Sequence, residues 1–357
     1  MKHQISIVGG QITPIFWGIK ERNPDKIHIL YTKDSRHHVP IIKNLFSEKE
    51  LFSYQVNPYD FEEIKEKVEN IILNFPDDAF ELNLTGGTKV MALACQNIFN
   101  ILSFNTFYID QGNRIFDFKE HTYKNIESKI KLDTFINLSG HKKYTSSKIV
   151  DYTKDEINFS KNISQLSGTN TYKNLIKAVK TKVQNIESCQ TFSYSHDNIK
   201  LHWNSPNFSF SNGNSTVILS SKKAFDIAFN GSWWELVIAD QIKNWNKIYE
   251  LRLNVELYSK TVNQNVKNEI DIVLNTGRNL IFIECKSGNV TQDDINKIRA
   301  VKRLYGGIAS RSILVCKYKP RPDIIEKCND LGIAIFFERN LQYLNNKLEN
   351  LIMSMEL

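Results

Sequence analysis

The sequence predicts an α/β protein built from two domains, and three observations support this. Segments typical of strands and of helices alternate through the first third of the chain. A strand, a two-glycine turn and a helix follow one another at 80–101, and two apolar runs near the C-terminus form a hairpin that carries acidic residues. The 357 residues are enough for two domains, because one domain commonly holds about 100–200 residues.

The N-terminal elements follow from the spacing of apolar residues. In 59–75 these residues recur at helical spacing, whereas 27–31 is a short apolar run of the kind found in strands. Asp34 or Ser35 is placed to cap the helix that ends near 46. The alternation of strand and helix indicates a mostly parallel, Rossmann-like sheet. We expect strands at 5–8, 27–31, 80–84 and 107–110 and helices at 14–20, 35–46, 59–75 and 88–101.

The segment NLTGGTKVMA at 83–92 places the two-glycine turn between a strand and a helix. Thr88 stands at or near the N-cap of that helix, where exposed backbone N–H groups can bind an anion. Glycine lets a phosphate or ribose approach the backbone closely. The spacing matches neither G-x-x-x-x-G-K-[ST] nor G-x-G-x-x-G. The segment predicts a phosphate-binding turn, and the alternative is an ordinary capped turn.

The C-terminal hairpin consists of NEIDIV at 268–273 and LIFIECKSG at 280–288, joined by a tight turn at Gly277. Alternation places Asp271 and Glu284 on one side of adjacent strands, and Lys286 points the same way. Carboxylate oxygens suit Mg²⁺ or Mn²⁺, and such ions position a water and stabilise charge at phosphorus. The alternative is that an acidic strand end and an E-x-K triplet occur together by chance.

Chemistry suggests a role for each of these groups. Asp271 and Glu284 bind the metal directly, with the backbone carbonyl of Cys285 as a candidate third oxygen. Lys286 orients or helps to deprotonate the attacking water and offsets charge on the phosphorane. The Cys285 thiol alternates to the opposite face and is expected to be packing. Glu269 is expected to point away from Asp271 into solvent and is left outside the site.

Composition limits the class of protein. The chain is 41% hydrophobic and 24% charged, with no stretch of about 18 apolar residues. Its first residues lead directly into a strand and carry no signal-peptide pattern. The five cysteines are scattered and lack a C-x-x-C pair, which argues against a disulfide framework and structural zinc. We expect a cytoplasmic protein that does not span a membrane.

Positive charge is unevenly placed. The formal net charge is +7, and between 297 and 321 there are eight basic residues and no acidic one. Such a stripe suits a phosphate backbone, and the alternative is a solvated helix face. The candidates for nucleic-acid binding are Lys297, Arg299, Lys302 and Arg303.

The middle of the chain is less informative, because Asn, Ser, Thr and Lys dominate residues 136–215. Apolar spacing predicts a helix at 171–183, and 205–215 reads as a loop. We expect a connector that packs on the first domain and reaches the second. A small winged-helix-type insertion is the alternative.

The turn and the hairpin each resemble a known family. N-L-T-G-G-T-K-x-M-A after a strand is similar to the ligand motif of CARF domains, which are sensors of cyclic oligoadenylates, and this likeness covers residues 1–135. The hairpin resembles the PD-(D/E)xK nuclease core over 216–357, although Ile270 stands where the motif has proline. Glu235, at the start of a helix ahead of the hairpin, matches the acidic residue of that family and is implied to reach the metal directly or through water. A chain with both parts resembles the ancillary nucleases of type III CRISPR systems.

This resemblance implies a homodimer that binds cyclic oligoadenylate, most simply cyclic tetra-adenylate, on its two-fold axis. It implies an endonuclease that depends on Mn²⁺ or Mg²⁺, is activated by that ligand and cleaves DNA, RNA or both. The alternatives are a non-catalytic regulator that binds nucleic acid and an unregulated repair or restriction-type nuclease. The residues implied to contact the cyclic ligand are Gly10, Gln11, Thr13, Thr32, Lys33, Thr85, Gly86, Gly87, Thr88 and Lys89.

Overall fold

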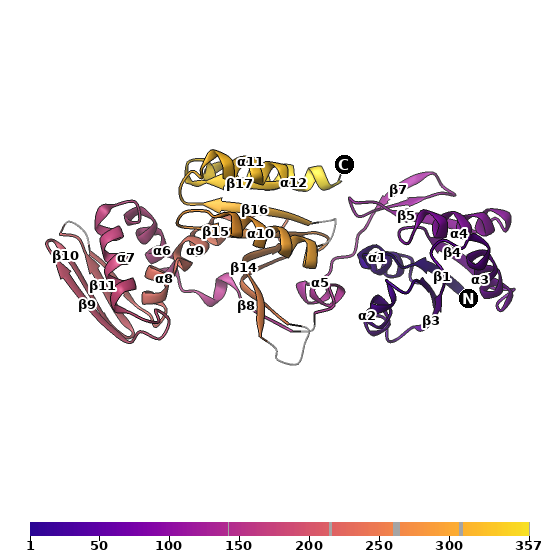
Figure 1. Cartoon of the computed structure of the whole chain (residues 1–357), viewed down its shortest axis with the longest axis horizontal. Helices are drawn as coiled ribbons and strands as arrows, with labels where there is room; N and C mark the ends of the chain where they lie inside the picture. The colour runs from indigo at the N-terminus through magenta and orange to yellow at the C-terminus, as the bar shows by residue number, and fades with distance from the viewer. Residues whose placement is uncertain (142, 214–215, 260–264, 307–309, 357) are drawn as a thin grey trace.

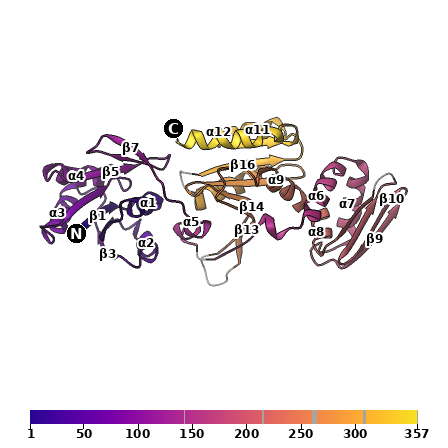
Figure 2. The same cartoon turned by 180° about the vertical axis from the view of Figure 1, so that it is seen from behind.

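The computed structural model describes residues 1–141, 143–213, 216–259, 265–306 and 310–356, apart from the side chains of 354–356. The described strands form three sheets in a row along the long axis of the molecule, with the N-terminal sheet at one end and a four-stranded sheet at the other (Figure 1). The view from behind shows the same order (Figure 2). None of the described helices is both long and apolar enough to cross a membrane.

The N-terminal sheet has the strand order β3-β2-β1-β4-β5-β6-β7. Strands β1 to β5 pair in parallel and β6 and β7 antiparallel, which confirms the mostly parallel α/β prediction. Its elements are β1 (Lys2–Ile7), α1 (Thr13–Arg22), β2 (Lys26–Tyr31), η1 (Arg36–His38), α2 (Val39–Leu45), β3 (Glu50–Gln55), α3 (Phe61–Leu73), β4 (Ala79–Asn83), α4 (Lys89–Ile101), β5 (Asn105–Ile109), β6 (Arg114–Asp117) and β7 (Thr122–Asn125).

Two parts of this domain differ from the prediction. The helix expected at 35–46 is a 3₁₀ turn followed by the shorter α2, which begins at Val39 with Pro40 in its first turn, where a missing N–H does no harm. Strands β3, β6 and β7 were not predicted. They lie toward the two edges of the sheet. Strands β3 and β7 are largely exposed, and β6 alternates buried and partly exposed positions, so none of the three has the continuous apolar run that marks a buried strand.

The two helices that flank the two-glycine turn begin at side-chain caps. The Asp60 side chain accepts a hydrogen bond from the Glu63 N–H at 3.0 Å and opens α3, whose buried face includes Ile64, Val68 and Ile71. Thr88 accepts from the Met91 N–H at 3.2 Å and opens α4, as the sequence predicted.

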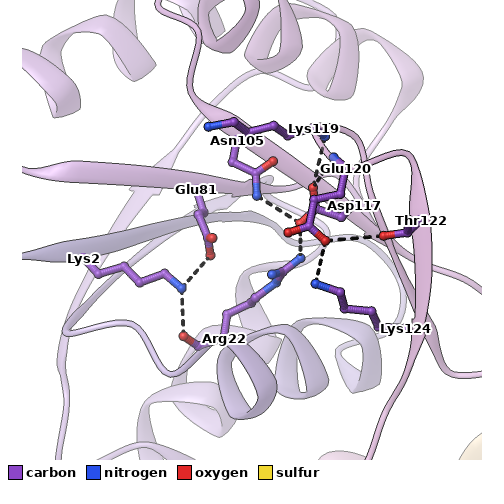
Figure 3. Close-up of polar contacts among 9 residues, drawn as sticks. All are labelled: Lys2, Arg22, Glu81, Asn105, Asp117, Lys119, Glu120, Thr122 and Lys124. Atoms are coloured by element: carbon purple, nitrogen blue, oxygen red, sulfur yellow. Dashed lines mark hydrogen bonds and ion pairs between the residues drawn. The ribbon is translucent and has the colours of Figure 1, made fainter.

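A buried carboxylate ties the β5–β6 hairpin to α1. Asp117 is 1% exposed and accepts hydrogen bonds from Arg22 at 2.7 Å and Asn105 at 3.2 Å (Figure 3). Its other oxygen accepts from the backbone N–H groups of Lys119 and Glu120. Burial alone would raise the pKa of Asp117, but the hydrogen bonds from Asn105 and Arg22 outweigh it and hold the pKa below its usual value.

We expect Arg22→Met to lower the free energy of unfolding by about 2–4 kcal/mol, because it leaves the buried Asp117 carboxylate without its cation. The contribution of the pair is present at neutral pH and is lost on acidification below about pH 4, through the depressed pKa of Asp117. The matched control is Lys124→Met, since the Lys124–Glu120 pair is about half exposed on both sides and should contribute less than about 1 kcal/mol. Urea unfolding at pH 7 tests this, and equal effects of the two variants would contradict it.

The central sheet has the order β17-β16-β15-β14-β13-β8. Strands β13, β14 and β15 are antiparallel neighbours, and β15, β16 and β17 run parallel. The elements of this part are α5 (Leu132–Leu138), β8 (Tyr144–Ser147), α8 (Ala224–Asn230), α9 (Ser232–Ile242), β13 (Glu250–Tyr258), β14 (Val266–Asn275), β15 (Leu280–Lys286), α10 (Gln292–Val301), η3 (Lys302–Gly306), β16 (Ser310–Cys316), α11 (Pro322–Asp330), β17 (Ile333–Phe337), η4 (Glu338–Tyr343) and α12 (Leu344–Glu356).

The region expected to be a connector is more structured than predicted. It contains η2 (Ile149–Asp151), α6 (Lys154–Leu166), α7 (Asn170–Lys182) and the antiparallel strands β9 (Thr191–His196), β10 (Ile199–Asn204), β11 (Asn207–Ser211) and β12 (Thr216–Ser220). The helix predicted at 171–183 is confirmed as α7, but the loop expected at 205–215 was wrong, because β11 lies there.

The meander β9 to β12 also lies elsewhere than expected. It is at the end of the molecule far from the N-terminal domain, so it does not pack on that domain (Figures 1 and 2). Its inward side chains, among them Trp203, Phe208 and Phe210, belong to one continuous core with α9 and the central sheet. Nearer to the first domain, β8 is the edge strand of the central sheet beside β13.

The first domain and the central sheet share a core. Helix α5 contributes Leu132, Phe135 and Ile136 to a cluster that also holds Trp17 of α1 and Ile270 of β14. Because close-packed interiors transmit displacements, a change in the first domain has a direct mechanical route to the hairpin.

Candidate functional site

The hairpin predicted from the sequence is β14 and β15. Ile272 pairs with Ile283, and the same register places Asp271 opposite Glu284 at the next position. The two carboxyl side chains are buried, 9% and 4% exposed, and the Asp271 carboxylate accepts a hydrogen bond from the Cys285 N–H at 2.6 Å. The predicted placement of Asp271 and Glu284 on adjacent strands is therefore confirmed, and their catalytic role stays a prediction.

Lys286 lies among carboxylates, as expected, but one of its partners was missed. Its Nζ is 2.9 Å from Glu284 and 3.0 Å from Asp294 in the first turn of α10. Lys297, one turn further along α10, is 3.2 Å from the same Glu284 oxygen. Burial alone would lower the pKa of Lys286, but the charge of Glu284 and the hydrogen bonds to Glu284 and Asp294 raise it above its usual value. The side chain is therefore a fixed cation.

Glu235 joins this cluster from the first turn of α9. Burial and the charges of Asp271, Glu269 and Glu284 raise the pKa of Glu235 well above its ordinary value. Burial and the charge of Glu284 likewise raise the pKa of Asp271 to about 7, against the opposing hydrogen bond from Cys285. Such shifts arise where carboxyl groups crowd together with little water, which is typical of sites that hold a cation.

Glu269 corrects the sequence interpretation. We expected it to point away from Asp271, but residues two apart in a strand share a face, and both lie in β14. In the structure its charge contributes to the raised pKa of Glu235, so it lies near that carboxyl group. It is exposed at the rim, unlike the buried Asp271. Correct use of the two-residue period would have placed it there.

The cluster contains the donor set for a hard divalent ion, although its side chains are not gathered around one point. Among the described residues, no group of three or more His, Cys, Asp or Glu side chains is close enough to hold a metal ion. Glu284 instead faces Lys286 and Lys297. The chemistry nevertheless fits Mg²⁺ or Mn²⁺, because buried carboxylates with raised pKa values gain most from a cation. Cys285 is buried and its thiol has a raised pKa because of that burial, consistent with packing.

A second site lies at the carboxyl edge of the N-terminal sheet. A cavity of about 650 Å³ opens there between the loop after β1 and the two-glycine turn. Of the ligand residues implied by resemblance, it is lined by Gly10, Thr32, Gly87 and Thr88. His37, His38 and Tyr59 also line it and were not predicted. Ser139, Arg303 and Leu304 reach the same cavity from outside the first domain.

The two predicted threonines that do not line the first cavity, Thr13 and Thr85, line a smaller cavity of about 90 Å³. Gln11, Thr13 and Thr85 line it, together with Gly306 from η3. Two of the threonines predicted to contact the ligand use their hydroxyl groups in hydrogen bonds to the backbone. Thr85 accepts a hydrogen bond from the Ile109 N–H at 2.6 Å, and Thr88 donates one to the Pro58 carbonyl at 2.6 Å.

The glycines of the two loops have different reasons for being glycine. A Cβ on Gly86 would lie 2.1 Å from the Ile7 carbonyl oxygen, and one on Gly9 would lie 2.7 Å from the Gly87 nitrogen, so the two loops pack backbone against backbone. A Cβ on Gly10 would meet no atom within 4 Å. Packing thus requires Gly86, whereas Gly10 faces open space in the cavity.

We therefore expect Gly86→Ala and Gly10→Ala to behave differently. Gly86→Ala should lower the free energy of unfolding by about 1–3 kcal/mol, because the Ile7 backbone must move. Gly10→Ala should leave unfolding unchanged and should act only on whatever occupies the cavity. Thermal unfolding of both variants checks this, and equal loss of stability would contradict the assignment.

Several predicted residues lie outside these cavities. Lys33 and Lys89 are exposed and line neither of them. Among the basic candidates, Arg299 is exposed on α10, and Lys302 is partly buried with a pKa lowered by burial and by Arg311. Lys317, part of the basic stripe, is buried and donates to Ser164 at 3.0 Å.

Comparison with known proteins agrees with this architecture. The family described as Card1 CARF domain matches residues 4–135, and the family described as Card1-like, endonuclease domain matches residues 222–355. No curated protein matches.

Two solved structures share the fold over nearly the whole chain. Can2 from Sulfobacillus thermosulfidooxidans, in complex with cyclic tetra-adenylate, is 20% identical with a TM-score of 0.75 and 99% of each chain covered. Protein VC1899 from Vibrio cholerae is 14% identical with a TM-score of 0.77, covering 99% of this chain and 98% of that one.

Each of the two sites thus falls inside a recognised domain. The carboxylate cluster with Lys286 belongs to the endonuclease domain, and most residues that line the cavity at the glycine loops belong to the CARF domain. The chain belongs to the CARF nucleases of type III CRISPR systems, with a Card1 CARF domain followed by a Card1-like endonuclease domain.

Proposed function

We propose that this protein is a metal-dependent endonuclease activated by cyclic oligoadenylate, with cyclic tetra-adenylate as the activator, in type III CRISPR defence. The observation that carries the nuclease part is the convergence of three acidic side chains and one lysine from α9, β14 and β15. The negative charge of Glu284 helps to raise the pKa of Glu235 and of Asp271 in a buried cluster beside Lys286. A domain that only binds nucleic acid does not require several carboxylates crowded together beside a phosphate.

Asp271 and Glu284 would hold Mn²⁺ or Mg²⁺, with the Cys285 carbonyl and Glu235 as further oxygens. When bound, the ion supplies an activated water and neutralises charge that develops at phosphorus. Lys286, kept cationic by Glu284 and Asp294, orients the water and stabilises the phosphorane. Glu269 at the rim of the cluster adds a carboxylate on the solvent side.

A surface for nucleic acid adjoins the cluster. The segments that follow the parallel strands β15 and β16 line a cavity of about 350 Å³, with Gly288, Thr291, Tyr318, Lys319 and Arg321 among its residues. Lys319 and Arg321 suit a phosphodiester, and Tyr318, 42% exposed, can stack on an unpaired base. With the exposed Arg299 on α10, and with Lys297 and Lys302, these residues would guide DNA or RNA to the carboxylates.

The cavity of the CARF domain suits a ring of nucleotides. Its backbone N–H groups, hydroxyls and histidines can contact phosphate and ribose, and a volume of about 650 Å³ holds part of such a ligand. The similar fold of Can2, solved with cyclic tetra-adenylate, supports this choice of ligand.

The activator would bind a homodimer on its two-fold axis, so that both copies offer the same residues. Exposed apolar side chains on the CARF domain support a partner there, since Tyr59 is 76% and Leu93 of α4 is 64% exposed. Activation requires that the ligand binds the active arrangement more tightly than the inactive one.

The test is a cleavage assay on single-stranded RNA, single-stranded DNA and supercoiled plasmid, each with and without Mn²⁺ and cyclic tetra-adenylate. Light scattering of the protein, with and without cyclic tetra-adenylate, gives the mass of the protein and so tests whether it is a dimer. Cleavage only when ion and ligand are both present is the expected result. Cleavage with Mn²⁺ alone would contradict activation by this ring, and ligand binding without cleavage of any substrate would indicate a non-catalytic regulator.

A further inference from the structure

The ligand cavity is lined in part by the endonuclease side of the chain. Arg303 and Leu304 of η3 line the 650 Å³ cavity with Gly10, Gly87 and Thr88. Gly306, at the end of the same segment, lines the smaller cavity with Thr85. Three of the five residues of η3 therefore line cavities formed by the two loops of the CARF domain. The sequence predicted that Arg303 contacts nucleic acid, and in the structure it lines this cavity.

Helix α10 runs from the carboxylate cluster directly into η3. Asp294, at its start, contacts Lys286 at 3.0 Å, and Lys297 contacts Glu284 at 3.2 Å. At 1.5 Å per residue, Asp294 and Arg303 are roughly 13 Å apart along one helical segment. One continuous helical segment therefore connects the cavity of the CARF domain with Lys297 and, through Asp294, with Lys286.

The η3 segment is also fixed to the central sheet. Tyr305 is buried, its hydroxyl accepts a hydrogen bond from Asn268 of β14 at 2.8 Å, and its ring packs on His141. Gly306 lies so close to Phe282 of β15 that a Cβ there would be 2.6 Å from the ring. A displacement of η3 therefore moves the two strands that carry Asp271 and Glu284 rather than being absorbed locally.

Arg303 has the chemistry to read a phosphate in the cavity. It is exposed, and among the described residues its guanidinium has no hydrogen-bond or ion-pair partner. Among the described residues that line the cavity, Asp34 has the only carboxylate side chain. A guanidinium that faces a concave site with its donors free binds phosphate in a two-pronged, directional way.

We propose that Arg303 binds a phosphate of the cyclic oligoadenylate and that α10 transmits this contact to Lys297 and Lys286 at the carboxylates. This inference rests on the proposed function and adds a ligand-binding residue from the endonuclease side. The ligand thereby holds η3 against the CARF loops, and η3 sets the position of α10. The positions of Lys286 and Lys297 relative to Glu284 then depend on whether the ligand occupies the cavity.

The first experiment compares Arg303→Met with Arg299→Met by calorimetric titration of the full-length protein with cyclic tetra-adenylate. Arg299 is the matched control, because it is an exposed arginine of the same helical segment that does not line the cavity. Arg303→Met should weaken binding about 10- to 100-fold, the range for one charge-assisted contact, and Arg299→Met should leave it unchanged. Wild-type affinity in Arg303→Met would overturn the inference. Failure of the wild-type protein to bind the ligand would instead contradict the proposed function.

The second experiment tests transmission through α10. Ala300 is exposed in the last turn of α10, and Ala300→Gly loosens the helix without touching either end. Its affinity for cyclic tetra-adenylate should stay within about twofold of wild type, whereas cleavage at saturating ligand should fall severalfold. Glu326→Gly, at an exposed position of α11, is the control and should not change the stimulated rate. Equal stimulated rates in Ala300→Gly and wild type would overturn the role of α10.

Discussion

Glu284→Gln is expected to reduce ligand-activated cleavage about 10²-fold or more while leaving cyclic tetra-adenylate binding intact. The glutamine keeps the size of the side chain but removes the charge that faces Lys286 and Lys297 and that would hold the metal. Single-turnover cleavage at saturating Mn²⁺ measures the loss. Affinity for the ligand should not change, because Glu284 lines neither cavity of the CARF domain.

The matched control is Glu326→Gln, an exposed glutamate on α11 of the same domain, which should cleave at the wild-type rate. Circular dichroism shows whether both variants are folded. Cleavage by Glu284→Gln within about threefold of wild type would mean that the hairpin is not the active site.

The second large effect is on stability, and it comes from Asp271. Burial beside Glu284 raises its pKa to about 7, so the folded protein binds a proton that the unfolded chain releases near pH 4. Without divalent metal, its contribution to stability is therefore most favourable below pH 4 and declines as the pH rises to about 7. A shift of this size corresponds to a few kcal/mol. We expect wild type to be less stable at pH 8 than at pH 5, and Asp271→Asn to lose much of that difference.

Metal reverses this dependence, because a divalent ion competes with the proton for the same carboxylates. Mn²⁺ should raise the melting temperature of the wild-type protein more at pH 8 than at pH 5, and should raise that of Asp271→Asn little at either pH. Thermal unfolding with Mn²⁺ and with chelator at the two pH values measures both effects. An equal shift at both pH values would contradict a metal site at Asp271.

Much of the N-terminal domain could be predicted because its strands are buried and its caps are local. Thr88 caps α4 through a contact three residues away, and a threonine before an apolar helical run is a sufficient signal. The edge strands β3 and β7 could not be predicted this way, since exposed positions interrupt their apolar pattern. The meander β9 to β12 was missed for a related reason. Ser, Thr and Asn fill its outward positions and mimic the composition of a loop.

The catalytic candidates could be predicted in part. Strand alternation was enough to bring Asp271, Glu284 and Lys286 together, because both strands belong to one hairpin. The same rule, applied correctly, also places Glu269 on that face. Asp294 and Lys297 could not be assigned, since their contacts depend on how α10 lies against β15, and no local pattern states that.

The order of the domains, the two-glycine turn and the acidic hairpin could be predicted from the sequence, because each depends on residues close together in the chain. That residues of both domains line the cavity at the glycine loops is visible only in the folded protein. Arg303 is more than 200 residues from Gly87 in the sequence, and the two line one cavity only because α5 and η3 pack the endonuclease domain against the loops of the CARF domain. Contacts between distant segments arise from the packing of whole elements, which spacing along the chain does not encode.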